Sequence, residues 1–193
     1  YCVFFSKQKT AYDFKYGLVG SEKCIRDSHN KCSSRQGNNK GSSTPRNNYS
    51  YPAAVPGNIH LDLLTTKNIE DPFYRANEKL QQWIGAVDWE YTTHFDITST
   101  DFKMDNIFIV FDWLDTYADV FLNDELLLSA DNMYCGWRLN IKPFALQKNN
   151  ELRIVFFSVE TKTIPVFEDN GFEYGANNSQ PEPKISVYNR KPG

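Results

Sequence analysis

Asp105–Asn132 reads DNIFIVFDWLDTYADVFLNDELLLSADN, and this stretch decides the fold. Short runs of β-branched and aromatic residues are bounded here by Asn and Asp, which is the pattern of strands joined by tight turns. We expect strands at Ile107–Phe111, Ala118–Leu122 and Glu125–Ser129. Asn123-Asp124 would form the tight turn between the last two. The stretch predicts an antiparallel sheet and, taken alone, no chemistry.

Further strands are expected on both sides of this stretch. Tyr91–Ile97 alternates apolar and polar residues with a period of two, as in a strand with one wet face. Trp137–Ile141, Leu152–Ser158 and Ile185–Tyr188 are the other expected strands. About five to seven short strands without strand–helix alternation indicate an all-β fold, a β-sandwich or jelly roll of antiparallel strands.

One or two short helices are expected near the start of the domain. Asn58 can cap a helix that places Ile59 and Leu63 on one side. Asp71-Pro72 is a second start signal, and Asn77–Ile84 fits a short helix ended by Gly85. The apolar face of that helix is predicted to consist of Leu80, Trp83 and Ile84. Thr161–Pro183 is expected to be a long irregular loop.

Composition and charge exclude several classes of protein. Residues 1–50 carry nine Lys/Arg and three Asp/Glu, whereas residues 51–193 carry twelve and twenty-one, so the folded part is acidic. This argues against nucleic acid as a partner. No apolar run reaches the roughly 18 residues that a membrane span needs. The four Cys and three His show no metal-ligand spacing, so we predict no metal site, no disulfide framework and no cofactor.

Residues 1–50 differ in composition from the rest of the chain. Lys7–Asp13 and Leu18–Ser28 resemble translated sequencing adapter, which would leave residues 1–28 without an evolved function. The alternative is a genuine short hairpin or flexible arm. Ser33–Ser50 is polar and of low complexity, and it cannot bury enough apolar surface to fold by itself. We therefore divide the chain into a non-native or flexible segment, 1–50, and a sandwich domain, 51–193.

Several motifs, in order, carry a resemblance to a known family over about 140 of the 193 residues. They are Ala54–Leu64 (AVPGNIHLDLL), Asp71–Tyr74 (DPFY) with Asn77-Glu78, Gln82–Ile84 (QWI), Asp88–Tyr91 (DWEY), Leu114–Asn123 (LDTYADVFLN) and Ser129–Met133 (SADNM). Together they resemble the N-terminal domain of a β-mannosidase of glycoside hydrolase family 2.

The resemblance implies a jelly-roll domain, often called the sugar-binding domain, which an immunoglobulin-like domain and a (β/α)₈ barrel follow in the intact enzyme. It also implies retaining hydrolysis of terminal β-mannosides, which requires two carboxylates about 5 Å apart. Both family Glu residues belong to the barrel, beyond Gly193. Arg190-Lys191 resembles the start of a segment that continues, in the family, into a Gly-Trp-Asp-Trp-Gly loop touching the sugar. We therefore expect a truncated domain with no catalytic residue, inactive alone.

Four residues are candidates for contact with a sugar, and each has a structural alternative. Trp89 and Trp137 could stack on a sugar ring, but packing in the core or rim is favoured. Asp131 and Asn132 could bond hydroxyl groups, but a turn with Asx capping is favoured. Asp62 and Glu78 lie in separate helical segments, and nothing in the sequence brings them together as an acid/base pair.

The leading hypothesis is a non-catalytic domain that packs on the catalytic barrel of its parent and helps to wall the substrate pocket. Its partners would be that barrel and, in the intact enzyme, a β-mannoside or manno-oligosaccharide. The alternatives are a free-standing carbohydrate-binding module and a non-catalytic adhesion or scaffold sandwich. We expect a soluble chain without a visible signal peptide; a periplasmic, secreted or lysosomal parent remains open.

Overall fold

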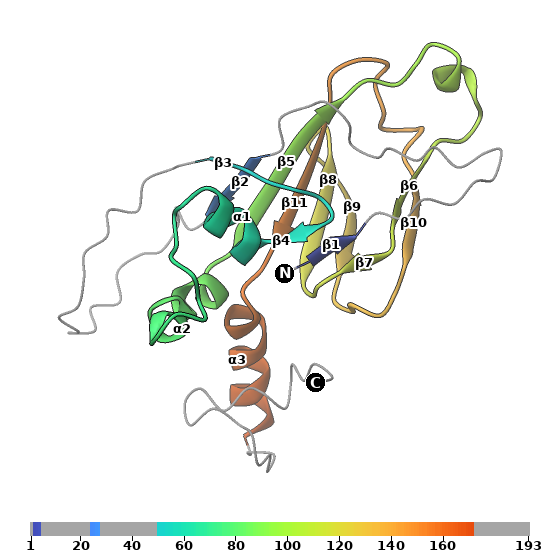
Figure 1. Cartoon of the computed structure of the whole chain (residues 1–193). Coiled ribbons are helices and arrows are strands. Elements are labelled where there is room, and N and C mark those ends of the chain that lie inside the picture. The colour runs from blue at the N-terminus through green and yellow to red at the C-terminus, as the bar shows by residue number, and fades with distance from the viewer. Residues whose placement is uncertain (1, 5–23, 28–49, 172–193) are drawn as a thin grey trace.

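The computed structural model describes residues 2–4, 24–27 and 50–171. Its strands form two layers, and the short helices lie beside and beyond one end of them (Figure 1). The larger layer is an antiparallel sheet with the strand order β3-β2-β5-β11-β8-β9. Its strands are β3 (Tyr51–Pro52), β2 (Cys24–Asp27), β5 (Trp89–Phe95), β11 (Asn150–Phe156), β8 (Ala118–Leu122) and β9 (Glu125–Ala130).

The smaller layer consists of two short sheets that continue one another. One has the order β4-β1-β7 and the other pairs β10 with β6. Only Asp112 separates β6 from β7, so the chain passes directly from one sheet into the next. The strands are β1 (Cys2–Phe4), β4 (Gly57–Asn58), β6 (Phe108–Phe111), β7 (Trp113–Leu114) and β10 (Trp137–Asn140).

A single hydrophobic core fills the space between the layers. Ile154 of β11 lies opposite Val120 of β8 in the larger sheet, and both are buried. Phe111 and Leu114 of the smaller layer are fully buried in the same cluster. Alternate residues are buried on β6, β8 and β11, as the period-two pattern of the sequence requires. The described part of the chain is therefore an antiparallel β-sandwich, as predicted.

The predicted strands agree with the structure to within two residues. The prediction for Ala118–Leu122 coincides with β8, and the following turn is at the predicted place. Asn123 and Asp124 have φ values of 51° and 68°, the left-handed pair that a two-residue type I′ hairpin turn needs. The expected strand Ile185–Tyr188 lies outside the described residues.

Two pieces of the N-terminal segment are strands of the sandwich. Cys24–Asp27 lies between β3 and β5 in the larger sheet, and Cys2–Phe4 lies between β4 and β7. The sequence did not foresee this, because residues 1–50 were expected to be flexible or unrelated to the domain. The other residues of that segment lie outside the described ranges.

The first helix is confirmed and the second differs from the prediction. In α1 (Ile59–Thr65), the Asn58 side chain accepts a hydrogen bond from the Leu61 amide, as a cap should. The expected helix Asn77–Ile84 is instead a single turn, α2 (Asn77–Leu80), followed by the 3₁₀ helix η1 (Gln82–Ala86). Gly85 lies inside η1 and does not end it.

The break between α2 and η1 has a local cause. The Gln81 side chain donates a hydrogen bond to the Glu70 carbonyl 2.7 Å away, which ties this position to the preceding loop. Leu80 and Ile84 consequently do not share a buried face, because Leu80 is 75% exposed and Ile84 is fully buried. Asp71 caps a turn by accepting from the Phe73 amide, and Arg75 at φ 56° prevents a helix from starting at Pro72.

The expected loop Thr161–Pro183 is wrong for its first part, which belongs to α3 (Val159–Asn170). Ser158 fixes the start of α3: its amide donates to Asp88 and its hydroxyl donates to the Gly85 carbonyl. Gly171, in the left-handed conformation, ends the helix. The prediction took Pro165 as a sign of a loop, because a proline inside a helix removes one backbone hydrogen bond. In the structure, α3 contains Pro165.

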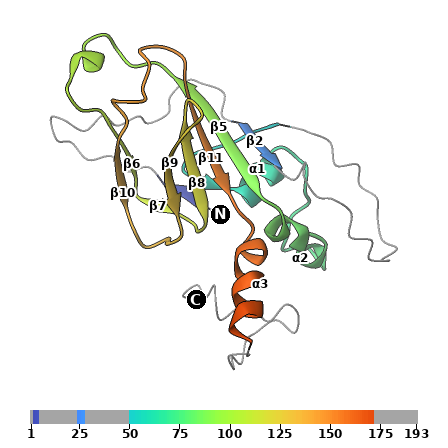
Figure 2. The ribbon, with the colours of Figure 1, turned by 180° about the vertical axis from the view of Figure 1, so that it is seen from behind.

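α3 extends from the end of β11, away from the sheet (Figure 2). It packs against η1, which also contacts α2, so these three segments lie together near that end of the sandwich, whereas α1 contacts β3 and β4. The β8–β9 turn lies at the opposite end. The loop that carries the 3₁₀ helix η2 (Asp101–Lys103) extends from that same end (Figure 1). We call these the helical end and the turn end.

Candidate functional site

Trp89 is a core residue in the structure. Its side chain is 1% exposed and its indole Nε1 donates a hydrogen bond to the Ile84 carbonyl at 2.9 Å. Its ring lies 6.0 Å from that of Trp83, measured between centroids. No face of the Trp89 ring is open to a sugar.

Trp137 is half-buried at the start of β10, opposite Phe111 of β6. Its indole Nε1 is buried and has no hydrogen-bond partner among the described residues. An indole N–H is a donor that usually finds an acceptor when it is buried. The polar edge of Trp137 is closed to a ligand in this arrangement, and only part of its ring is accessible.

Asp131 and Asn132 are exposed in the loop that joins β9 to β10. Asn132 Oδ1 accepts a hydrogen bond from the Tyr134 amide at 2.9 Å. This is an Asx turn, in which the side chain stabilises its own loop. Since Trp89 is in the core, the four candidate residues do not form one surface.

Two exposed aromatic residues near this loop were not selected from the sequence. Trp113 of β7 and Tyr134 each expose about half or more of their surface. The loop runs close to the junction of β6 and β7, because a Cβ on Gly136 would lie 3.6 Å from the Phe111 carbonyl oxygen. Exposed aromatic rings can stack on a sugar. Trp113 lies in strand β7 and Tyr134 in the loop before β10, and no sequence pattern singled them out.

Two carboxylates, Asp62 and Asp115, are buried in the described part of the chain, and both have structural partners. Asp62 Oδ1 accepts from the Ala54 amide at 2.9 Å, and its Oδ2 lies 3.5 Å from the Tyr91 hydroxyl. Asp115 accepts from the hydroxyl of Thr116 across a cis peptide bond.

These two carboxylates do not resemble a glycosidase pair. Such a pair must flank an open space that admits the sugar, whereas Asp62 and Asp115 are both closed off in the interior. Glu78 lies exposed on α2. Asp62 joins α1 to the segment before it and to β5, which explains a buried charge without catalysis.

Asn123 and Asn150 organise the turn end of the sandwich. Asn150 is fully buried. Its Nδ2 donates to the carbonyls of Leu146 (2.7 Å) and Phe95 (3.3 Å), and its Oδ1 accepts from the Leu146 amide at 2.7 Å. Asn123 Nδ2 donates to the same Oδ1 at 3.2 Å, and Asn123 Oδ1 accepts from the Glu151 amide. The pair therefore joins three strands and one loop.

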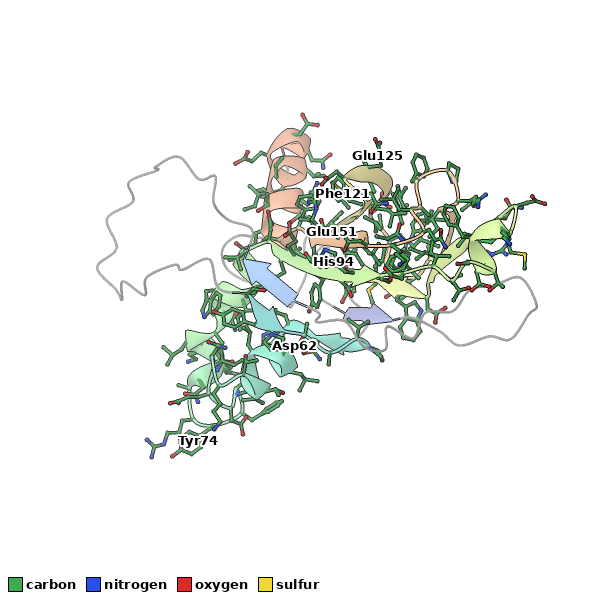
Figure 3. The ribbon with its side chains drawn as sticks, turned by 90° about the horizontal axis from the view of Figure 1, so that it is seen from above. Asp62, Tyr74, His94, Phe121, Glu125 and Glu151 are labelled. Atoms are coloured by element: carbon green, nitrogen blue, oxygen red, sulfur yellow. The ribbon has the colours of Figure 1, made fainter. Side chains whose placement is uncertain are left out.

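The outer face of the larger sheet pairs polar side chains on neighbouring strands. His94 Nε2 lies 3.2 Å from Glu151 Oε2 on the neighbouring strand. Arg153 lies 3.5 Å from Glu90 and places its guanidinium 4.1 Å above the Phe121 ring. Figure 3 shows His94, Glu151 and Phe121 on adjacent strands. This is a solvated, self-compensated surface and has no feature of a reaction centre.

Titration and metal chemistry add little to the site. His60, on α1, is largely exposed, but partial desolvation lowers the pKa of its side chain from the ordinary value of 6.5. The described positions hold no group of three or more His, Cys, Asp or Glu that could bind a metal ion. Among the same residues, no helix is long and apolar enough to cross a membrane.

Fold and surface together define a class: an antiparallel jelly-roll sandwich of the galactose-binding-like type, with exposed aromatic residues at one end. Residues 33–192 match the family described as "Glycosyl hydrolase 2 galactose-binding domain-like", and the chain belongs to this family. The sequence analysis placed the start of the domain at Tyr51. The family match begins earlier, at residue 33.

Similar proteins include β-mannosidases from distant organisms. The chain is 36% identical to β-mannosidase B of Thermothelomyces thermophilus over 115 residues, which are 60% of this chain and 13% of the relative. It is 33% identical to the β-mannosidase of Mus musculus over 107 residues, 55% of this chain and 12% of the relative.

A solved structure supports the same relationship. The crystal structure of the β-D-mannosidase from Dictyoglomus thermophilum superposes with a TM-score of 0.70 at 25% identity, covering 84% of this chain and 18% of that one. The chain thus spans about an eighth of the length of the curated relatives that it matches.

Proposed function

We propose that this chain is the N-terminal, non-catalytic domain of a β-mannosidase-like glycosidase of family 2. In the parent, it would pack on the catalytic barrel and help to wall the pocket that receives a terminal β-mannoside. Retaining hydrolysis would take place on two carboxylates of the barrel, outside this chain.

The structural likeness to the Dictyoglomus β-D-mannosidase carries this proposal. Most of this chain superposes on less than a fifth of that enzyme, which supports a role as one domain among several. The chemistry of the described residues is consistent with such a role, because both buried carboxylates, Asp62 and Asp115, are engaged within the sandwich.

A graft tests the proposed role. The 193-residue chain replaces the matched portion of the Dictyoglomus enzyme, and an unrelated β-sandwich of similar size replaces it in a control. We expect the first graft to hydrolyse an aryl β-mannoside and the control graft to have lost activity. Equal rates of hydrolysis for both grafts would contradict a specific role for this domain. The absence of hydrolysis by either graft would contradict it as well.

The exposed rings of Trp113 and Tyr134 favour a second candidate, a free-standing carbohydrate-binding module. Calorimetric titration of the 193-residue chain with manno-oligosaccharides separates the two. Saturable binding that is lost in both Trp113→Ala and Tyr134→Ala would favour the module. The leading proposal predicts no binding by the isolated chain.

A further inference from the structure

The helical unit, residues 59–86, exposes more large apolar side chains than its size explains. Its exposed residues are Leu61, Leu64, Phe73, Tyr74, Leu80 and Trp83. Phe73 is 97% exposed and Leu80 is 75% exposed. Single exposed apolar residues are ordinary, but six of them within one unit of 28 residues are more than scattered exposure would give. We call these six residues the apolar cluster.

The cluster is held on an ordered frame. Gln81 Nε2 donates to the Glu70 carbonyl at 2.7 Å, and Asn77 Nδ2 donates to the Asp71 carbonyl at 2.9 Å. These two bonds tie the loop that carries Phe73 and Tyr74 to the helix that carries Leu80. An apolar surface that is ordered before binding loses less conformational entropy when a partner docks.

The apolar cluster extends from the edge of the hydrophobic core to the outer tip of the helical unit. Trp83 is partly exposed, yet its ring lies 6.0 Å from that of the buried Trp89. Tyr74 lies at the far tip of the helical unit, away from the strands (Figure 3). The unit therefore projects from the sandwich, with its inner end anchored in the core and its outer end presenting aromatic rings.

The charges on the unit indicate what kind of partner it fits. Among its exposed charged residues, Lys67, Arg75 and Lys79 are balanced by Glu70, Asp71 and Glu78. The seventh charged residue, Asp62, is buried. A balanced set attracts neither the phosphates of a nucleic acid nor an anionic lipid surface, both of which select basic patches. Apolar and aromatic residues within a rim of both charge signs are typical of a protein–protein interface.

The partner that would cover the apolar cluster is inferred from the length of the relatives. The chain covers 18% of the Dictyoglomus enzyme, so more than four-fifths of such a parent lies outside it. We propose that the apolar cluster is the surface on which the catalytic portion of the same parent chain docks. This inference rests on the proposed function and assigns its interdomain contact to Phe73, Tyr74 and Leu80 in particular.

The test compares two double variants within the graft described above. Phe73→Ser/Leu80→Ser alters the cluster. Leu126→Ser/Leu146→Ser is the matched control, because each of these leucines is 54% exposed and lies outside the helical unit. Phe73→Ser alone is a third variant, since a side chain 97% exposed contributes almost nothing to folding of the domain itself.

We expect the cluster variant to lower kcat/KM of the graft by at least about tenfold, as loss of central aromatic and aliphatic anchors does at interfaces. Phe73→Ser alone should lower it in the same direction, and the control should stay within about twofold. In the ungrafted chain, Phe73→Ser should leave the melting temperature unchanged. A cluster variant that matches its control in an active graft would overturn the inference.

Two other outcomes are distinguishable. An inactive unsubstituted graft overturns the proposed function itself, and this inference with it. Sedimentation velocity of the ungrafted chain tests a second copy as the occupant: a dimer that Phe73→Ser converts to a monomer would overturn the interdomain assignment. A chain that stays monomeric at all concentrations supports it.

Discussion

Asn150→Ala should strongly destabilise the sandwich. The substitution removes the hydrogen bonds to the Leu146 amide, to the Leu146 and Phe95 carbonyls and to the Asn123 side chain. Each buried polar group left without a partner costs about 1–3 kcal/mol. Counting two such groups gives an expected loss of about 2–6 kcal/mol. For a domain of this size, that lowers the melting temperature by about 10 °C.

Urea unfolding followed by tryptophan fluorescence measures this loss. Asn106→Ala is the control, because the exposed Asn106 makes one side-chain bond with Asn140 and should cost less than about 1 kcal/mol. Asn150→Asp keeps the acceptor but faces the Leu146 and Phe95 carbonyls with a carboxylate, so its loss should shrink as the pH falls and the carboxylate is protonated. An Asn150→Ala variant as stable as Asn106→Ala would refute the reasoning.

Three further predictions concern stability. Asp124→Gly should stabilise the β8–β9 turn by about 0.5–1 kcal/mol in urea unfolding, since Gly accepts a positive φ without strain, whereas Asp124→Ala should not. Asp62→Ala should cost about 1–3 kcal/mol because the part-buried Ala54 amide loses its acceptor. Tyr91→Phe should cost less than about 1 kcal/mol, since its hydroxyl contact with Asp62 is long. Similar losses for both would contradict this. Burial lowers the pKa of His60, so its neutral form favours folding: this contribution is present above pH 6.5 and is lost as the pH falls through the folded pKa. His60→Gln should flatten that part of a melting-temperature profile between about pH 5 and 8, and an unchanged profile would contradict it.

The strands were predictable because their signal is local. Alternation in Ala118–Leu122 and a turn pair at Asn123-Asp124 are sufficient to place a hairpin, and the structure has both. By contrast, β1 and β2 depend on pairing with strands far along the chain, which composition does not report. α3 was missed because its start depends on Ser158 bonding to Asp88 and Gly85, a tertiary contact.

The candidate site was less predictable than the fold. For Trp89 the sequence favoured packing over sugar contact, and the side chain is buried. Its partners, Trp83 and the Ile84 carbonyl of η1, could be found only in the structure. Asp71–Tyr74 was identified as part of a family motif, and its proline suggested a helix start. In the structure this segment turns outward and exposes Phe73 instead. Side-chain exposure is a property of the assembled domain, so the apolar cluster could be found only there.

The central claim is that this chain performs no hydrolysis by itself and acts as a part of a larger enzyme. Incubation of the purified 193-residue chain with an aryl β-mannoside, followed by release of the phenol, tests it most directly. We predict a rate equal to that of buffer. Turnover that co-purifies with the chain and is lost in Asp62→Asn or Asp115→Asn, with folding intact by circular dichroism, would contradict the claim.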